Sequence, residues 1–341
     1  MKILPLHPQT EINGYLFYTI PYNILYTYPE YTDYLMEHYM QCFGYVDERN
    51  CMIFGYADGV GYHGDMFYDM GPLEINFHSY AVGLQLDIEK YIISSIDNNY
   101  YVTIFVDEYY IENRPAYKKN HHIHEILIHG YDNEKFYYFT FDRRVLLSTF
   151  QRSQTADAYK FGYSIYINMS EWEKVNWVYE KSIILLKPKQ IQNQYTFSEI
   201  RFIENLKSYL NGEFGASYNS FAMPKEKCYI GVYNTNLIID CIENLSPSGN
   251  VYIIYPSIHA WYESKKNLLN KIKYFYEKAN YKNDIFISEY ERSVVKQADA
   301  IRLSFIKYQQ SGKLNKDAVK LLLNDIFISE KNILDNILLV R

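Results

Sequence analysis

Runs of strand-forming residues dominate the first half of the chain. The segments "YYVTIFVDEYYI" (100–111), "HEILIHGYD" (124–132) and "KFYYFTFD" (135–142) are rich in Tyr, Phe, Val and Ile. Aromatic and β-branched residues favour strands, and Asn, Asp and Gly between such runs favour turns. The last two segments therefore predict an antiparallel hairpin that turns at residues 132 to 135.

Two helices are predicted within the same half. One covers residues 16 to 27, where Pro21 is expected early in the helix, at a position that tolerates a missing N–H. The other covers residues 86 to 99, because Leu86, Ile88, Ile92 and Ile96 recur at close to helical spacing. Asn residues at 98 and 99 form a plausible end for it.

The pattern changes to helical after about residue 197. The segment "TFSEIRFIENLKSYLNG" (196–212) has capping residues at its start, an amphipathic body and a terminal glycine, and similar stretches continue to the end of the chain. A polar stretch with Pro188, at 187 to 196, marks the boundary. We predict two domains, residues 1–190 with strands and helices and residues 191–341 mostly helical, which is an α+β protein with an antiparallel sheet.

Composition limits the possible functions. The 341 residues are 48% hydrophobic and 22% charged, with a net charge of -6, which is typical of a globular protein and does not favour nucleic-acid binding. No apolar run is long enough to span a membrane and no signal core opens the chain, so a cytoplasmic location is expected. The 39 tyrosines reflect either an AT-rich genome or a tyrosine-lined pocket.

Two common ligand motifs are not convincing here. The four cysteines show no C-x-x-C spacing, so neither a zinc site nor a disulfide framework is predicted. Residues 59 to 64 fit G-x-G-x-x-G, but the sequence after them does not predict the helix that a dinucleotide site needs. We therefore expect no metal and no cofactor.

Four histidines lie within residues 121 to 129. Strand alternation places His122 and His124 on one face, whereas His121 and His129 point elsewhere, so only two are positioned for a shared ligand. A catalytic dyad is the alternative. His124 and Asp142 are eighteen residues apart around a nearly central turn, so a symmetric hairpin brings them opposite each other. A carboxylate so placed fixes the imidazole tautomer of a base.

Four segments resemble a known family. "INGYLFY", "YYVTIFVDEYYIENRPAY", "HHIHEILIHGYD" and "IHAWYESKK" are similar to the BtrH-type family of papain-like acyltransferases from butirosin-type and nonribosomal peptide clusters. The resemblance implies a papain-like domain followed by a helical region. It also implies transfer of an acyl group from a carrier-protein phosphopantetheine thioester to a small-molecule amine. On this basis His124 is the general base and Asp142 orients it.

The nucleophile that the family uses is not obvious. The position that matches its cysteine is Tyr18, whose phenol is a poor acyl nucleophile. Asn13, just upstream, could contribute to an oxyanion hole. The true nucleophile could instead be Cys42, at the end of a helix-like run, or Cys51, although both are also typical core residues.

Three functional hypotheses follow from the missing thiol. The first is direct aminolysis, in which His124 deprotonates an amine that attacks the thioester without a covalent intermediate. The second is an inactive binding or scaffold protein of such a pathway. The third is a cysteine peptidase or amidase that uses Cys42 or Cys51.

Several other residues are candidates for substrate contacts. Asp107, Glu108 and Glu112 follow a strand and, with Arg114 and basic neighbours, favour a solvated loop. We predict that a substrate channel is lined by Tyr109, Tyr110 and Tyr117. We predict that an acyl pocket is lined by His259 and Trp261. An acidic carrier protein needs a basic patch to dock. The predicted patch is formed by Lys265, Lys266, Lys271 and Lys273.

Overall fold

The computed structural model describes residues 1–9, 11–47, 52–59, 71–142, 144–169, 182–190, 195–215, 228–243, 255–281 and 284–339. The chain divides into two compact units. Unit 1 is residues 1–10, 16–31 and 60–194, and unit 2 is residues 11–15, 32–59 and 195–341. The last crossing lies inside the expected linker, but residues 11–15 and 32–59, which the sequence assigned to the first domain, belong to unit 2.

Unit 1 is built around an antiparallel sheet with the strand order β4-β9-β5-β6-β7-β8, and β1 pairs with β6. Its strands are β1 (Lys2–Ile3), β4 (Leu73–His78), β5 (Tyr101–Asp107), β6 (Ile123–Tyr131), β7 (Lys135–Asp142), β8 (Arg144–Gln151) and β9 (Ile183–Pro188). Its helices are α1 (Leu16–Tyr26), α3 (Tyr80–Gly83), α4 (Ile88–Asp97) and α5 (Thr155–Ile167), with 3-10 turns η1 (Pro29–Tyr31), η2 (Glu108–Tyr110) and η3 (Arg152–Gln154).

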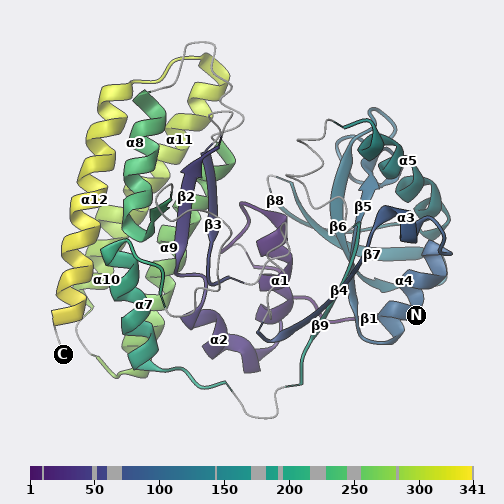
Figure 1. Cartoon of the computed structure of the whole chain (residues 1–341), viewed down its shortest axis with the longest axis horizontal. Helices are drawn as coiled ribbons and strands as arrows, with labels where there is room; N and C mark the ends of the chain where they lie inside the picture. The colour runs from purple at the N-terminus through teal and green to yellow at the C-terminus, as the bar shows by residue number, and fades with distance from the viewer. Residues whose placement is uncertain are drawn as a thin grey trace. The chain divides into compact units, whose positions relative to one another are not determined.

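Helices cover both faces of this sheet. Figure 1 shows α1 on one side and α4 and α5 on the other, and α1 contacts β7 and β9 while α4 and α5 contact β5 and β6. All seven residues of β5 are buried, which agrees with its position between covered faces. A polar residue at the end of β5 is therefore buried as well, and Asp107 is such a residue.

The hairpin predicted at residues 132 to 135 is confirmed. The carboxylate of Asp132 accepts hydrogen bonds from the backbone N–H groups of Glu134 (2.9 Å) and Lys135 (2.7 Å). The side chain thus provides an acceptor for N–H groups of the turn, in place of ladder bonds to a neighbouring strand. The pairing of β6 with β7 shifts register between Ile128 and Gly130, so His129 lies at an irregularity of the strand.

The two helices predicted in the first half are also present. The helix α4 is capped by Asp87, whose side chain accepts the N–H of Lys90 at 3.3 Å, and it ends at Asp97 with Asn98 as its C-cap. The interpretation of Pro21 was wrong, however. Because α1 starts at Leu16, Pro21 lies beyond the first turn and removes the helical bond to the carbonyl of Phe17.

Unit 2 combines a helical core with a small antiparallel sheet, β10-β2-β3. Its strands are β2 (Cys42–Val46), β3 (Met52–Tyr56) and β10 (Tyr229–Ile230). Its helices are α2 (Thr32–Glu37), α7 (Glu199–Asn211), α8 (Asn234–Glu243), α9 (Tyr255–Lys278), α10 (Ile285–Tyr290), α11 (Lys296–Ser311) and α12 (Lys316–Leu339), with the 3-10 turn η6 (Gly231–Tyr233) and the π-helical segment η8 (Glu291–Val295). The expected helical C-terminal region is therefore present.

The helix α9 is central to unit 2. It contacts β3, α2, α10, α11 and η8, and its Trp261, Ile272 and Phe275 are almost completely buried. The ring of Phe275 stacks on Phe202 of α7 with centroids 4.7 Å apart. A helix contacted on several sides hides even its charged residues, which has consequences for the predicted lysine patch.

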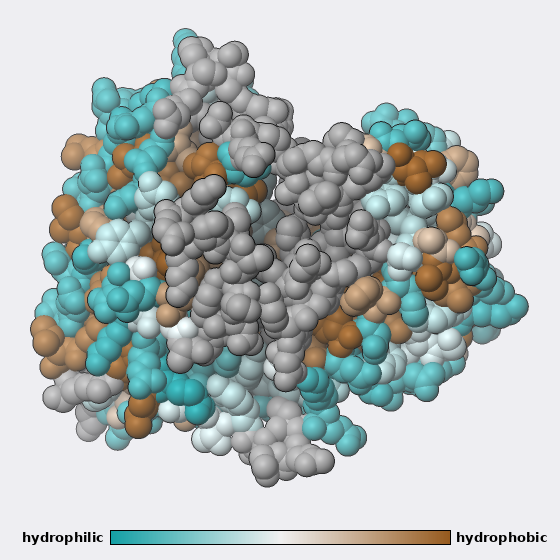
Figure 2. Space-filling view, viewed as in Figure 1, coloured by the Kyte–Doolittle hydropathy of each residue, from teal (hydrophilic) through white to brown (hydrophobic). Residues whose placement is uncertain are grey.

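The described surface is mixed in character. The coloured part of Figure 2 shows hydrophilic side chains interspersed with separate apolar spots. No helix in the described part of the chain combines the length and the apolar character that crossing a membrane requires.

Candidate functional site

The end of β5 delivers two buried carboxylates. Asp107 is the last residue of β5 and is completely buried, and Glu108 opens the 3-10 turn η2 and is only 3% exposed. The expectation of a solvated loop at these residues was wrong. Arg114 provides the physical reason, because its own buried guanidinium (5% exposed) lies against Glu108 and compensates its charge.

Asp107 organises the backbone around the histidines. Its Oδ1 accepts hydrogen bonds from the N–H groups of Tyr109 (3.1 Å) and His122 (2.9 Å), and its Oδ2 lies 2.5 Å from Nδ1 of His121. Three partners satisfy most of the acceptor capacity of one buried carboxylate. We therefore assign Asp107 a structural role, which is to hold η2 and residues 121 and 122 together.

Glu108 is the centre of a charged cluster. Its Oε1 accepts a hydrogen bond from Nε of Arg114 (2.6 Å) and lies 3.6 Å from Nδ1 of His124, while its Oε2 lies 3.4 Å from Nδ1 of His122. Burial raises the pKa of Glu108, but the contacts with His122, His124 and Arg114 outweigh it and the net pKa is lowered. Glu108 is thus an anion that faces two imidazoles.

The histidines divide between two faces as strand alternation predicted. His122 and His124 both point to Glu108, with ring centroids 5.9 Å apart. His121 stacks instead on Tyr109 (4.5 Å) and on Phe161 of α5 (5.8 Å). The described contacts thus separate the pair His122 and His124, beside Glu108, from His121, beside Tyr109 and Phe161.

His124 has the features of a neutral base. Its Nδ1 lies 3.0 Å from the carbonyl oxygen of Glu125, in addition to the Glu108 carboxylate. Both neighbours are acceptors, so the proton of the neutral ring belongs on Nδ1 and the lone pair on Nε2. Burial lowers the pKa of His124, and Glu108 opposes this shift without reversing it. The side chain is 26% exposed, so it is not sealed from solvent.

The expected partner of His124, Asp142, cannot be compared directly. Asp142 is the last residue of β7, and its backbone pairs with that of Arg144. Its side chain is not among the described parts of the chain. The β6–β7 pair nearest to positions 124 and 142 is Leu127–Phe139. Glu108 is the carboxylate that the described residues bring to His124, and sequence reasoning assigned it no such role.

The two residues expected near a nucleophile fall in different units. Tyr18 is the third residue of α1 in unit 1, is 4% exposed and packs its ring against Phe17 at 4.6 Å. Asn13 belongs to unit 2, where its backbone N–H donates to Oε2 of Glu263 at 2.9 Å. Asn13 is thus positioned by α9, and no role beside His124 follows from its described contacts.

The thiol of Cys42 is a poor nucleophile. Cys42 starts β2, not the end of a helix, and is 1% exposed. Burial raises its pKa to about 12, so the thiol stays protonated. These features argue against a catalytic Cys42 and support a core role. Cys51 lies outside the described residues.

The proposed substrate contacts receive different support. Tyr109 and Tyr110 are half-buried next to His121, with Tyr110 stacked on Phe161 at 5.3 Å. The side chain of Tyr117 is half-buried, with Nζ of Lys118 5.1 Å from its ring centroid. The described ring contacts of Tyr109 and Tyr110 are thus with each other, His121 and Phe161, and not with His124.

The residues expected to line an acyl pocket belong to α9 in unit 2. Trp261 is completely buried and belongs to the core of unit 2. His259 is 22% exposed, and its Nε2 lies 3.1 Å from Oε1 of Glu263, the same carboxylate that binds Asn13. Sequence reasoning named His259 and Asn13 separately, and the structure joins them through Glu263.

The predicted basic patch on α9 is wrong for two of its four lysines. Lys265 is completely buried and its Nζ lies 2.7 Å from Oε2 of Glu330. Lys271 is also completely buried and donates to the carbonyl of Leu35. Only Lys266 and Lys273 of this set retain exposed surface, because α9 is packed on most of its sides.

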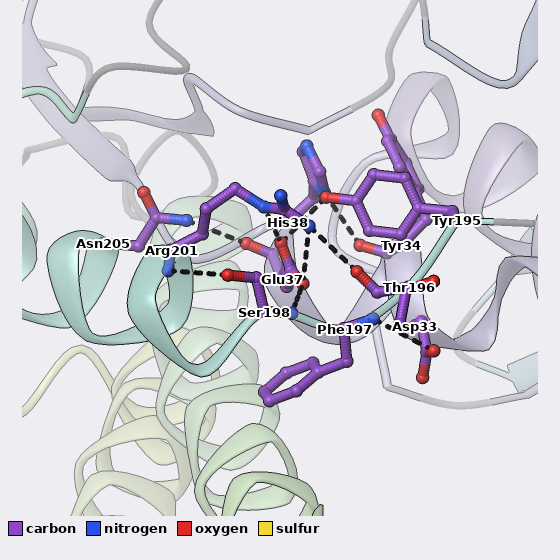
Figure 3. A network of polar contacts seen from close by, with 10 residues as sticks. All are labelled: Asp33, Tyr34, Glu37, His38, Tyr195, Thr196, Phe197, Ser198, Arg201 and Asn205. Carbon is purple, nitrogen blue, oxygen red and sulfur yellow. Dashed lines mark hydrogen bonds and ion pairs between the residues drawn. The ribbon is translucent and has the colours of Figure 1, made fainter.

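Another buried carboxylate, that of Glu37, forms a network in unit 2 (Figure 3). Oε2 of Glu37 accepts hydrogen bonds from the hydroxyl of Tyr195 (2.8 Å) and Nε of Arg201 (2.6 Å), and Oε1 accepts one from the N–H of Ser198. The Nδ2 of Asn205 donates to the carbonyl of Glu37 at 3.1 Å. This network joins α2 to the start of α7.

Comparisons with known proteins do not identify the chain. A scan against protein-family models and a search of curated proteins found no match. Among the described residues, no group of three or more His, Cys, Asp or Glu side chains is arranged to hold a metal ion.

Proposed function

We propose that the chain transfers an acyl group from a carrier-protein thioester to an amine, with His124 as the general base. One observation carries this proposal. The Nδ1 side of His124 is held by Glu108 and by the carbonyl of Glu125, which leaves the basic Nε2 for a substrate proton. A buried carboxylate that fixes the tautomer of a partly exposed imidazole is a recurrent arrangement for proton abstraction.

The proposed reaction is direct aminolysis. The amine nitrogen attacks the thioester carbonyl carbon, the new C–N bond forms, and Nε2 of His124 accepts a proton from that nitrogen. The tetrahedral oxyanion then collapses and the C–S bond breaks. The thiolate leaves and receives the proton from His124, so the base is regenerated. A thioester is reactive enough that positioning and proton transfer provide most of the required acceleration.

The described cysteines support a route without an acyl-enzyme. Burial raises the pKa of Cys42 and that of Cys241 to about 12, so both thiols stay protonated. Tyr18, at the position expected for a thiol, is nearly buried and carries a phenol. Papain-like topology for unit 1, the carrier protein and natural-product assembly remain parts of the proposal that come from the BtrH-type resemblance.

The proposal is tested by incubating the full chain with a peptidyl carrier protein loaded with an aminoacyl thioester and a panel of amines. Mass spectrometry should show amide formation and no acyl group on the enzyme. His124→Gln should lower the rate by about 10²- to 10⁴-fold. His78→Gln is the matched control, because His78 is a strand histidine of unit 1 bound to Tyr91 (2.7 Å).

Three outcomes would change the account. An unaffected His124→Gln variant would contradict the base, and an acyl group on the protein would contradict direct aminolysis. If the loaded carrier binds tightly but no amide forms with any amine, the alternative of a binding protein is correct. The nearly buried Tyr18 in place of a thiol is the observation that favours this alternative.

A further inference from the structure

The rings of His122 and His124 are held as a pair by one carboxylate. Their Nδ1 atoms lie 3.4 Å and 3.6 Å from the two oxygens of Glu108, and the ring planes are inclined by only 29°. In an imidazole the two nitrogens lie on different edges of the ring. With both Nδ1 atoms toward Glu108, both Nε2 atoms are therefore directed away from it.

The two outward nitrogens differ in access. The side chain of His122 is 59% exposed and that of His124 is 26% exposed, whereas Glu108 behind them is buried. Among the described contacts of the two rings, none involves either Nε2 atom. Because the two ring centroids are 5.9 Å apart, a substrate bound at His124 also lies close to the imidazole of His122.

We propose that His122 is a second catalytic residue, an imidazolium whose Nε2–H binds the thioester carbonyl oxygen while His124 accepts the amine proton. This inference rests on the proposed acyl transfer. It assigns complementary roles to two histidines of the same strand face, one a cation that donates and the other a neutral acceptor. The resulting oxyanion site uses a side chain and requires no contribution from Asn13.

The charges around the pair favour this division. The hydrogen bond to Glu108 raises the pKa of His122; burial and Arg114 oppose that shift, and Asp107 adds to it. Burial lowers the pKa of His124; Glu108 opposes this, whereas Arg114 and His122 contribute to it. Environments that move the pKa values of neighbouring groups apart typically separate an acid from a base.

The proton and electron balance is complete with these two residues. During attack, the carbonyl π electrons move to oxygen, and the oxyanion is stabilised by the Nε2–H of His122 without proton transfer. The amine proton moves to Nε2 of His124. When the C–S bond breaks, the oxygen returns to a carbonyl, the thiolate takes the proton from His124, and His122 remains protonated throughout.

The test is a pH–rate profile with the acetyl thioester of N-acetylcysteamine and an added amine, measured by thiol release. We expect kcat of His122→Gln to be about 10²-fold lower, the order found on loss of an oxyanion donor. The wild-type profile should be bell-shaped, rising with deprotonation of His124 and falling with deprotonation of His122. His122→Gln should lose the alkaline fall, and the His78→Gln control should keep the full profile.

Two results would overturn the inference. If His122→Gln keeps the wild-type rate and alkaline limb while His124→Gln is inactive, His122 is not catalytic, although the proposed function stands. If the wild type turns over no thioester, both proposals fail. NMR titration provides a readout that does not depend on activity. His122 should titrate above 6.5 and His124 below it, and a reversed order would contradict the assigned roles.

Discussion

Two buried carboxylates in this protein are surrounded by very different partners. Glu37 in unit 2 binds a tyrosine hydroxyl, a backbone N–H and a guanidinium, all of which are donors over the whole physiological pH range (Figure 3). Glu108 in unit 1 binds one guanidinium and faces two histidines. Both carboxylates are nearly inaccessible, at 1% and 3% exposure, so burial does not distinguish them.

The difference lies in the partners. Permanent donors around Glu37 fix two helices to each other and have no further chemistry to perform. The imidazoles around Glu108 can change charge near neutral pH and keep a second nitrogen for a substrate. A buried carboxylate therefore indicates function only when its partners are titratable and partly exposed, as His122 and His124 are.

The largest expected effect on stability comes from Glu37→Ala. The substitution leaves the Tyr195 hydroxyl and the Ser198 N–H without their acceptor, and we expect a loss of about 3 kcal/mol in the free energy of unfolding. Arg201→Ala is the control, and its effect should be smaller because that side chain is 51% exposed. Chemical denaturation measures both. An equal loss in both variants would contradict the central position of Glu37.

A similar effect is expected on acidification, through His38, which follows Glu37 in the chain and is drawn with it in Figure 3. Its Nδ1 is bound to the carbonyl of Tyr34 (2.8 Å), and burial lowers its pKa to about 4. The unfolded state therefore takes up the proton first. The contribution of His38 to the free energy of unfolding is complete above pH 6.5. It decreases as the pH falls toward 4, by up to about 3 kcal/mol.

Denaturation curves of the wild type and of His38→Gln check this prediction between pH 7 and 4. The variant removes the titrating ring, so its unfolding free energy should fall less over that range. Equal slopes would show that other groups cause the acid sensitivity.

An intermediate effect is expected for Glu108→Gln, this time on activity. The amide keeps an acceptor for Arg114 but removes the negative charge, so the pKa of His122 should fall and kcat/KM should drop about 30-fold, or about 2 kcal/mol. Thioester aminolysis and NMR titration measure the two changes. Glu37→Gln is the matched control and should leave both values unchanged. If the two variants behave alike, the contrast between the carboxylates is lost.

The smallest effect is expected for Cys42→Ala. Because the thiol is buried in β2 and protonated, we expect unchanged acyl transfer and a loss of about 1 kcal/mol in unfolding free energy. A large loss of activity with normal stability would favour the cysteine peptidase alternative.

The sequence predicted the local features of the fold well. The hairpin of β6 and β7, the helices α4 and α7 and the shared face of His122 and His124 all follow from periodicity and capping residues, which act over a few positions. The assignment of residues 32–59 to unit 2 could not be predicted in this way. It depends on packing between segments far apart in the chain, such as α2 with α7.

Errors about individual residues have the same origin. Glu108 and Lys265 have the charge and the spacing of surface residues, and each is buried because a distant or later partner compensates it. For Glu108 this partner is Arg114, and for Lys265 it is Glu330, sixty-five residues away. The candidate base could thus be predicted from its strand position, whereas its carboxylate partner could not.

The central claim is that His124 is a neutral imidazole with its proton on Nδ1 and its lone pair on Nε2. The ¹⁵N chemical shifts of the His124 ring, recorded at neutral pH on the full chain, test it most directly. The account predicts a protonated Nδ1 and an unprotonated Nε2. A proton on Nε2, or a ring that is already charged at neutral pH, would contradict the general base at this position.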